Sequence, residues 1–174
     1  LGLDSPFTSM QLLWLNVIMD GPPALSLSLE GVREEYMQYP PVKRSAGIIN
    51  KRILAKVIIN AGIIGFVVLY QYSTNFLNVN VTVLKAVTFT LFAFMNIFNA
   101  FNCKELGTES VIKNFFSNKL MVASMGVAMA LQFVITEFTG VFSPEKLGFK
   151  TWGKIIGISL MLILINELYK TAYR

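Results

Sequence analysis

The chain has 174 residues, of which 54% are hydrophobic and 14% charged, with a mean hydropathy of +0.57 and a formal net charge of +5. Soluble domains carry about 25% charged residues, so this composition excludes a mostly water-exposed protein and predicts an integral membrane protein. The single cysteine, Cys103, excludes an internal disulfide framework, and the absence of histidine excludes histidine-based catalysis. The basic residues lie in short loops between apolar segments, so we expect no binding to nucleic acid.

Residues 1–6 precede the first apolar segment and contain neither a basic region nor an initiator methionine. This pattern is not that of a signal peptide. We therefore expect the chain to be part of a longer protein.

Five apolar segments are long enough to cross a bilayer as helices. They cover residues 10–29, 53–72, 81–101, 120–138 and 152–173. No alternating pattern typical of strands extends over a comparable length. The sequence therefore predicts an all-α, polytopic transmembrane helical bundle that forms a single transmembrane domain over residues 1–174.

The first segment contains two polar side chains, Asn16 and Asp20, directly before the run Gly21-Pro22-Pro23. The spacing of four residues places both side chains on one face of a helix. The two prolines remove backbone donors and leave carbonyl groups free, so we predict a helix that is discontinuous at Gly21–Pro23. Amide, carboxylate and carbonyl oxygens suit a hard cation, and an ionisable group at membrane depth is by default a candidate functional site. The alternative is an acid that pairs with a distant lysine or lies near the interface.

The loops suggest an orientation. Residues 30–52, which we interpret either as a solvated connector or as a docking segment for a cytoplasmic partner, carry five Lys or Arg residues. With the third loop and the C-terminal end, ten Lys or Arg residues lie on one side, against only Lys85, Lys146, Lys150 and Lys154 on the other. The positive side of a membrane protein is normally cytoplasmic, so we predict a cytoplasmic C-terminus.

Two further patterns occur in the later segments. Asn96, Asn99 and Asn102 lie three residues apart and could form either an interhelical hydrogen-bond seam or part of an ion path. Gly153 and Gly157 form a GxxxG pair, and Gly126 and Ala130 repeat this spacing. Both pairs favour close packing of helix backbones.

The sequence QLLWLNVIMDGPPA at residues 11–24 resembles the sixth transmembrane helix of calcium-transporting P-type ATPases. Residues 98–102 are similar to the eighth helix of that family and residues 166–170 to the end of the tenth. The resemblance covers nearly the whole chain. It implies the C-terminal transmembrane region, helices six to ten, with Asn16 and Asp20 as ligands of a transported calcium ion.

Two positions depart from the two-site reticulum pumps of this family. Met19 stands where those pumps have threonine, and Asn96 stands where they have glutamate. The chain is therefore more similar to single-site plasma-membrane or secretory-pathway pumps, or to bacterial relatives. The run MDGPPA is close to the secretory-pathway type, which also transports manganese.

The resemblance also implies what lies elsewhere. The phosphorylation motif of the family, DKTGT, is absent from these 174 residues, so ATP and Mg²⁺ would bind in other domains of the parent protein and this chain alone would not hydrolyse ATP. Membrane lipid and those domains would be its partners, and the plasma membrane is the expected location. The alternatives are a stand-alone oligomeric cation channel or secondary carrier, or a non-transporting membrane scaffold.

Overall fold

A computed structural model describes residues 7–31, 41, 47, 51–105, 110–112 and 114–172. Most of the loop at residues 30–52, including the possible docking segment, lies outside these residues. Within them the chain is helical, without a strand, so the prediction of an all-α bundle is confirmed. The helices are α1 (Ser9–Trp14), η1 (Leu15–Asp20), α2 (Gly21–Ser28), α3 (Lys51–Thr74), η3 (Val81–Val83), α4 (Leu84–Lys104), α5 (Lys119–Phe138) and α6 (Phe149–Ala172).

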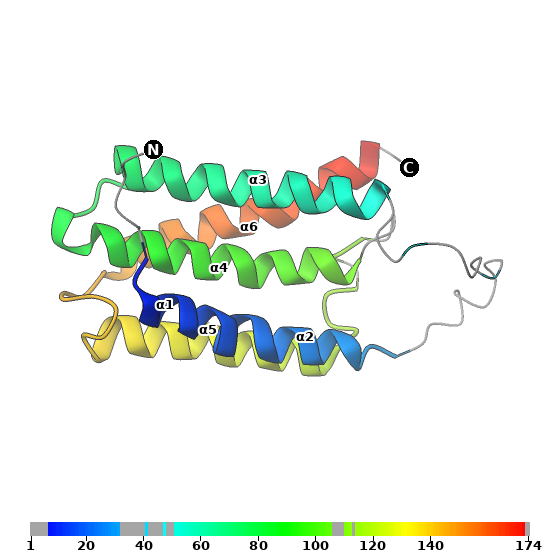
Figure 1. Cartoon of the computed structure of the whole chain (residues 1–174), viewed down its shortest axis with the longest axis horizontal. Helices are drawn as coiled ribbons and strands as arrows, with labels where there is room; N and C mark the ends of the chain where they lie inside the picture. Colours follow the sequence, from blue (N-terminus) through cyan, green and yellow to red (C-terminus); the bar gives the residue numbers. More distant parts are fainter. Residues whose placement is uncertain are drawn as a thin grey trace.

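Successive long helices run in opposite directions. Helix α2 ends, α3 begins, α4 ends, α5 begins and α6 ends at the same end of the bundle (Figure 1). The other end of the bundle carries the connections at residues 75–80 and 139–148. The loops that contain most of the basic residues are therefore attached to the end of the bundle where α2, α4 and α6 end.

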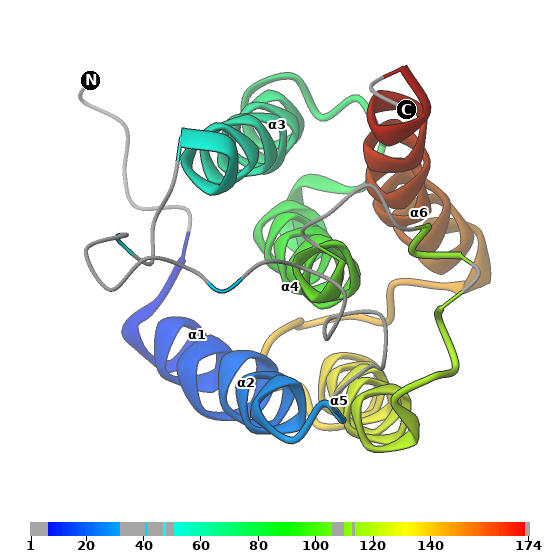
Figure 2. The same cartoon turned by 90° about the vertical axis from the view of Figure 1, so that its right-hand side faces the viewer.

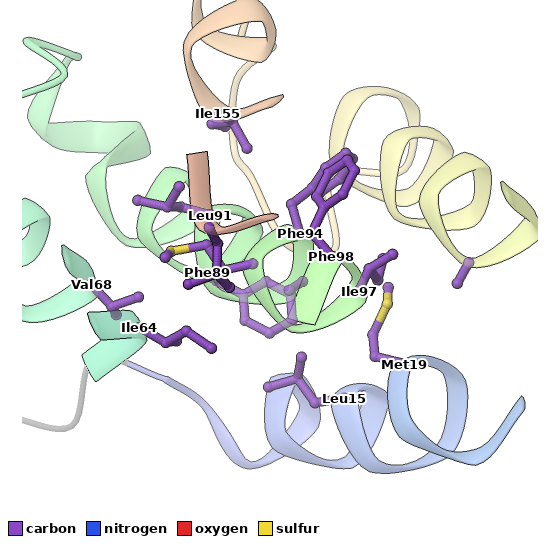
Figure 3. Close-up of a cluster of buried hydrophobic side chains, with 14 of the residues drawn as sticks. Leu15, Met19, Ile64, Val68, Phe89, Leu91, Phe94, Ile97, Phe98 and Ile155 are labelled. Atoms are coloured by element: carbon purple, nitrogen blue, oxygen red, sulfur yellow. The ribbon is translucent and has the colours of Figure 1, made fainter. Parts of the chain in front are cut away.

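We refer to α1, η1 and α2, which follow one another without a break, as the first helix. Helix α4 is the centre of the bundle, with the first helix, α3, α5 and α6 around it (Figure 2). In its most apolar 18-residue window 67% of the residues are buried, against 22–33% in α3, α5 and α6. Figure 3 shows how the other helices contribute to this core: Leu15 and Met19 come from the first helix, Ile64 and Val68 from α3, and Ile155 from α6. Packing in the bundle is thus organised by the side chains of α4.

The outer surface of the bundle is apolar. Large hydrophobic side chains are exposed on each outer helix, among them Leu13, Val17, Phe66, Val127 and Leu164. Four of the described helices, α3, the combined η3 and α4, α5 and α6, are long and apolar enough to cross a membrane. A surface of this kind suits contact with lipid, because isolated water-facing domains rarely expose so much apolar area.

The first helix differs from its prediction in one respect. The chain does not unwind at Gly21–Pro23; instead a π-helix, η1, occupies Leu15–Asp20 and a regular helix resumes at Gly21. Pro22 and Pro23 lie in the first turn of α2, a position where proline is tolerated because its fixed φ suits the start of a helix. The irregularity therefore lies before the prolines, as a wider turn that contains both Asn16 and Asp20.

The small-residue pairs do not bring helices together in the described part of the chain. A Cβ atom placed at Gly126, Gly153 or Gly157 would have no neighbouring atom within 4 Å. Prediction of close packing at these glycines is therefore wrong for these helices. In α6 it is instead larger side chains such as Ile155 and Leu162 that are buried in the core.

Candidate functional site

Asp20 is the last residue of η1 and its side chain lies beside α4. It lines a cavity of about 200 Å³ between the first helix and α4. The first helix also contributes Met19, Pro23, Ala24 and Leu27, and α4 contributes Asn96, Asn99, Ala100 and Cys103. We refer to this space as the Asp20 cavity. Its polar groups are one carboxylate and two side-chain amides, set against an otherwise apolar wall.

The asparagines of α4 have unused hydrogen-bonding capacity. Asn96 donates its Nδ2 to the carbonyl oxygen of Phe92 at 2.9 Å, on its own helix. The Oδ1 atoms of Asn99 and Asn102 are buried without a hydrogen-bond partner. An unpaired buried acceptor costs about 1–3 kcal/mol and calls for an explanation such as a missing ion or donor. Among the described residues, Asn102 alone of the three donates to another helix, from Nδ2 to the carbonyl oxygen of Leu162 at 3.4 Å.

Asn16 is separated from this cavity. Both Asn16 and Asp20 are exposed, but Asn16 does not line the Asp20 cavity, although it belongs to the same π-helix. Neither Asn16 nor Asp20 has a side-chain hydrogen bond or ion pair among the described residues. The alternative in which Asp20 pairs with a lysine is therefore not realised within this part of the chain, and both side chains are available to a ligand.

The Asp20 cavity borders a larger one of about 450 Å³ between α3 and α4. Asn96, Asn99 and Cys103 line both spaces, so the same face of α4 serves the two cavities. Lys56 lies at the larger cavity and donates its Nζ to the carbonyl oxygen of Glu105 at 3.3 Å. This buried ammonium group places a positive charge in the wall of the larger cavity and does not line the Asp20 cavity.

The donor set favours a hard cation over a soft one. Within the described residues no group of three or more Asp, Glu, Cys or His side chains lies together. A cation at Asp20 would thus have one carboxylate, the amides of Asn96 and Asn99, and backbone carbonyls. Pro22 and Pro23 cannot donate, which leaves carbonyl groups one turn earlier without their usual partners. Oxygen ligands of this kind suit calcium or manganese.

Sequence reasoning found Asp20 but did not assign Asn99 to the same cavity. The spacing of Asn96, Asn99 and Asn102 indicates a polar face on this helix. Whether that face forms a hydrogen-bond seam or part of an ion path depends on how the helices pack, which the sequence does not specify. It also gave no indication that Asn60 and Asn166 lie together, with an Nδ2–Oδ1 hydrogen bond of 2.9 Å between α3 and α6. Such contacts join residues far apart in the chain.

Comparison with known proteins agrees with this geometry. The profile of the family "Cation transporting ATPase, C-terminus" matches residues 4–172. The chain belongs to this family. Together with its four long apolar helices, this membership identifies an integral, multi-pass membrane protein and the membrane portion of a cation-transporting ATPase.

Three relatives illustrate the similarity. The chain is 34% identical to Calcium-transporting ATPase 1 of Schizosaccharomyces pombe, over 97% of this chain and 19% of the relative. It is 32% identical to Putative calcium-transporting ATPase 13, plasma membrane-type, of Arabidopsis thaliana, over 97% and 17%. With Calcium-transporting ATPase type 2C member 2 of Mus musculus the identity is 28%, over 97% and 18%. The chain thus spans less than a fifth of the length of these relatives.

Proposed function

We propose that this chain is the ion-coordinating membrane part of an ATP-driven calcium transporter. The names of the similar proteins support calcium as the transported ion. The observation that carries the proposal is Asp20, a carboxylate in an apolar helix that faces two asparagines across a cavity and has no hydrogen bond or ion pair with another described residue. Family membership favours a pump over a stand-alone channel, a secondary carrier or an inert scaffold.

In this proposal Asp20 and Asn16 are the cation ligands from the first helix, and Asp20 is the principal one. Asn96 and Asn99 of α4 lie where they can add amide oxygens to the same ion. Asn16 does not line the Asp20 cavity. It would bind the ion if the π-helix rotated, or if the ion lay between Asn16, Asp20 and another helix of the parent protein. Met19, which is 2% exposed and packs in the core, provides no oxygen. This donor set supports one cation site and not two.

The finer assignments follow from the same reasoning. The chemistry of the oxygens admits manganese as well as calcium. ATP and Mg²⁺ are bound by other domains of the parent protein, which are partners of this chain together with membrane lipid. The excess of basic residues supports a cytoplasmic C-terminus. The plasma membrane is the proposed location.

The test is the substitution Asp20→Asn in the full-length protein. We expect it to abolish calcium-dependent phosphorylation by ATP, because the neutral amide retains the size of the side chain but removes its negative charge. Glu137→Gln is a matched control, since Glu137 accepts hydrogen bonds from Leu147 N and Trp152 Nε1 at the far end of α5. It should retain the wild-type calcium dependence.

Retention of calcium-dependent phosphorylation in Asp20→Asn would contradict the proposal. Manganese is tested in the wild-type protein by replacing calcium with manganese in the same phosphorylation assay. Phosphorylation with calcium alone would restrict the assignment to calcium.

A further inference from the structure

The first helix contacts α5 through polar groups at two places, one on each side of the π-helix. On the N-terminal side, Trp14 donates its indole Nε1 to the Oε1 atom of Gln132 at 2.8 Å. Trp14 is the last residue of α1, so this bond is made directly before η1 begins. It therefore holds the first helix in place at the N-terminal end of η1, the segment that contains Asn16 and Asp20.

Gln132 is itself held in place. Its side chain is completely buried, and its Nε2 donates to the hydroxyl oxygens of Thr136 at 3.1 Å and Thr90 at 3.4 Å. One amide thus connects the first helix, α4 and α5. A buried amide inside an apolar bundle is unfavourable unless its groups are satisfied, and here both ends have partners. This arrangement makes the position of the Trp14 indole specific.

On the C-terminal side, the contact is made by Ser26 in α2. The hydroxyls of Ser26 and Ser124 lie 2.9 Å apart, and Asn118 donates its Nδ2 to the carbonyl oxygen of Ser26 at 2.9 Å. Between this contact and Trp14 lies a cavity of about 250 Å³, lined by Ile18 and Pro22 and by Ser124, Val127, Ala128 and Leu131 of α5. The middle of the segment is therefore loosely packed against α5, and the two polar contacts determine its position.

These contacts also fix the rotation of the helix. A π-turn contains one residue more than an α-helical turn over the same length, and one α-helical residue corresponds to a rotation of about 100°. If η1 relaxed to an α-helix, α1 and α2 would turn relative to each other by about that angle. Trp14 could then not reach Gln132 while Ser26 stayed at Ser124. The two contacts are therefore compatible only with the wider turn that directs Asp20 to α4.

We propose that Gln132 is a positioning residue for the cation site: through Trp14 it holds the π-helical register that places Asp20 in the cavity with Asn96 and Asn99. This inference rests on the proposed function, because it assigns Gln132 a role toward the cation ligands. Gln132 itself does not line the Asp20 cavity. Its effect on the cation is transmitted along the first helix.

The experiment uses the full-length protein with Trp14→Phe, Gln132→Leu and the double substitution. The calcium concentration for half-maximal phosphorylation by ATP is measured together with the maximal level. We expect each single substitution to raise the half-maximal concentration by about three- to tenfold, as expected for loss of one specific hydrogen bond. The half-maximal calcium concentration of the double variant should be no higher than that of the more strongly affected single variant, since both substitutions remove the same bond.

Gln71→Leu is the matched control. Gln71 is also completely buried, but it accepts from Leu77 N at 3.0 Å and lies in α3, away from the first helix. A structural loss there should lower the maximal level, through the amount of folded protein, and leave the half-maximal calcium concentration unchanged. Trp14→Phe retains an aromatic ring against Phe142 and so remains informative if Gln132→Leu fails to fold.

Two results separate the inference from the proposed function. A wild-type half-maximal concentration in Trp14→Phe, or additive effects in the double variant, would overturn the role of Gln132 and leave the function intact. Absence of calcium-dependent phosphorylation in the wild-type protein would overturn both, because no calcium site would then exist to be positioned.

Discussion

Asn99 contributes a buried oxygen to the bundle that no other group uses. Its Oδ1 has no hydrogen-bond partner among the described residues, and the residue lines both cavities beside α4. An apolar side chain of similar size would avoid the desolvation of this oxygen. A group that is unfavourable for the fold and faces a candidate site is typical of a residue with a functional role.

The substitution Asn99→Leu tests whether the Asn99 amide lowers the stability of the fold while it contributes to the function. We expect the variant to unfold at a higher temperature in detergent, with a gain of about 1 kcal/mol from removal of the unpaired amide. We also expect weaker calcium dependence of phosphorylation in the full-length protein. Asn166→Leu serves as the comparison, because Asn166 bonds Asn60 and its loss should lower stability. A less stable Asn99→Leu would indicate that Asn99 is an ordinary packing residue.

At the scale of the elements, the helices could be predicted and the π-turn could not. The ends of the helices lie within three residues of the ends of the five apolar segments, because long apolar windows select helices strongly in a membrane. Gly21-Pro22-Pro23 predicted an interruption near Asp20, but the hydrogen-bond register of Leu15–Asp20 leaves no periodic signal over six residues. The shared cavity of Asp20, Asn96 and Asn99 depends on packing between helices that are distant in sequence.

The glycines of α6 lead to a prediction at the same scale. Gly153 and Gly157 are exposed and a Cβ there would have no atom within 4 Å. Alanine is a better helix former than glycine by about 0.8–1 kcal/mol. We therefore expect Gly153→Ala to fold normally and to unfold at the same or a higher temperature, as measured by circular dichroism in detergent. A clear loss of stability would show that another helix packs closely on this face in the full-length protein.

Across the whole molecule, polar contacts join the helix ends at the end of the bundle that we predict to be cytoplasmic. Glu30 follows the first helix, accepts from Nδ2 of Asn118 at 2.8 Å and lies 3.7 Å from the Nζ atom of Lys104. Lys104 in turn donates to the carbonyl oxygen of Asn114 at 2.7 Å and to the Ser117 hydroxyl. The ends of α2 and α4 and the start of α5 are thus connected, and the Asp20 cavity extends toward this end, where Leu27 and Cys103 line it.

The orientation of the molecule in the membrane can be tested directly. Ten of the Lys and Arg residues are predicted to lie on one side and four on the other, and the end of α6 lies opposite the connection at residues 139–148 in the bundle (Figure 1). Because basic loops are retained in the cytoplasm, we expect an epitope tag after Arg174 to bind antibody only when the cytoplasmic face of sealed vesicles is outward. A tag inserted between Pro144 and Glu145 should bind only in vesicles of the opposite orientation, and permeabilised vesicles control for folding around each tag. If both tags bind antibody in the same intact vesicles, they lie on the same side of the membrane. The assignment of α6 as a single membrane-spanning helix between them would then be wrong.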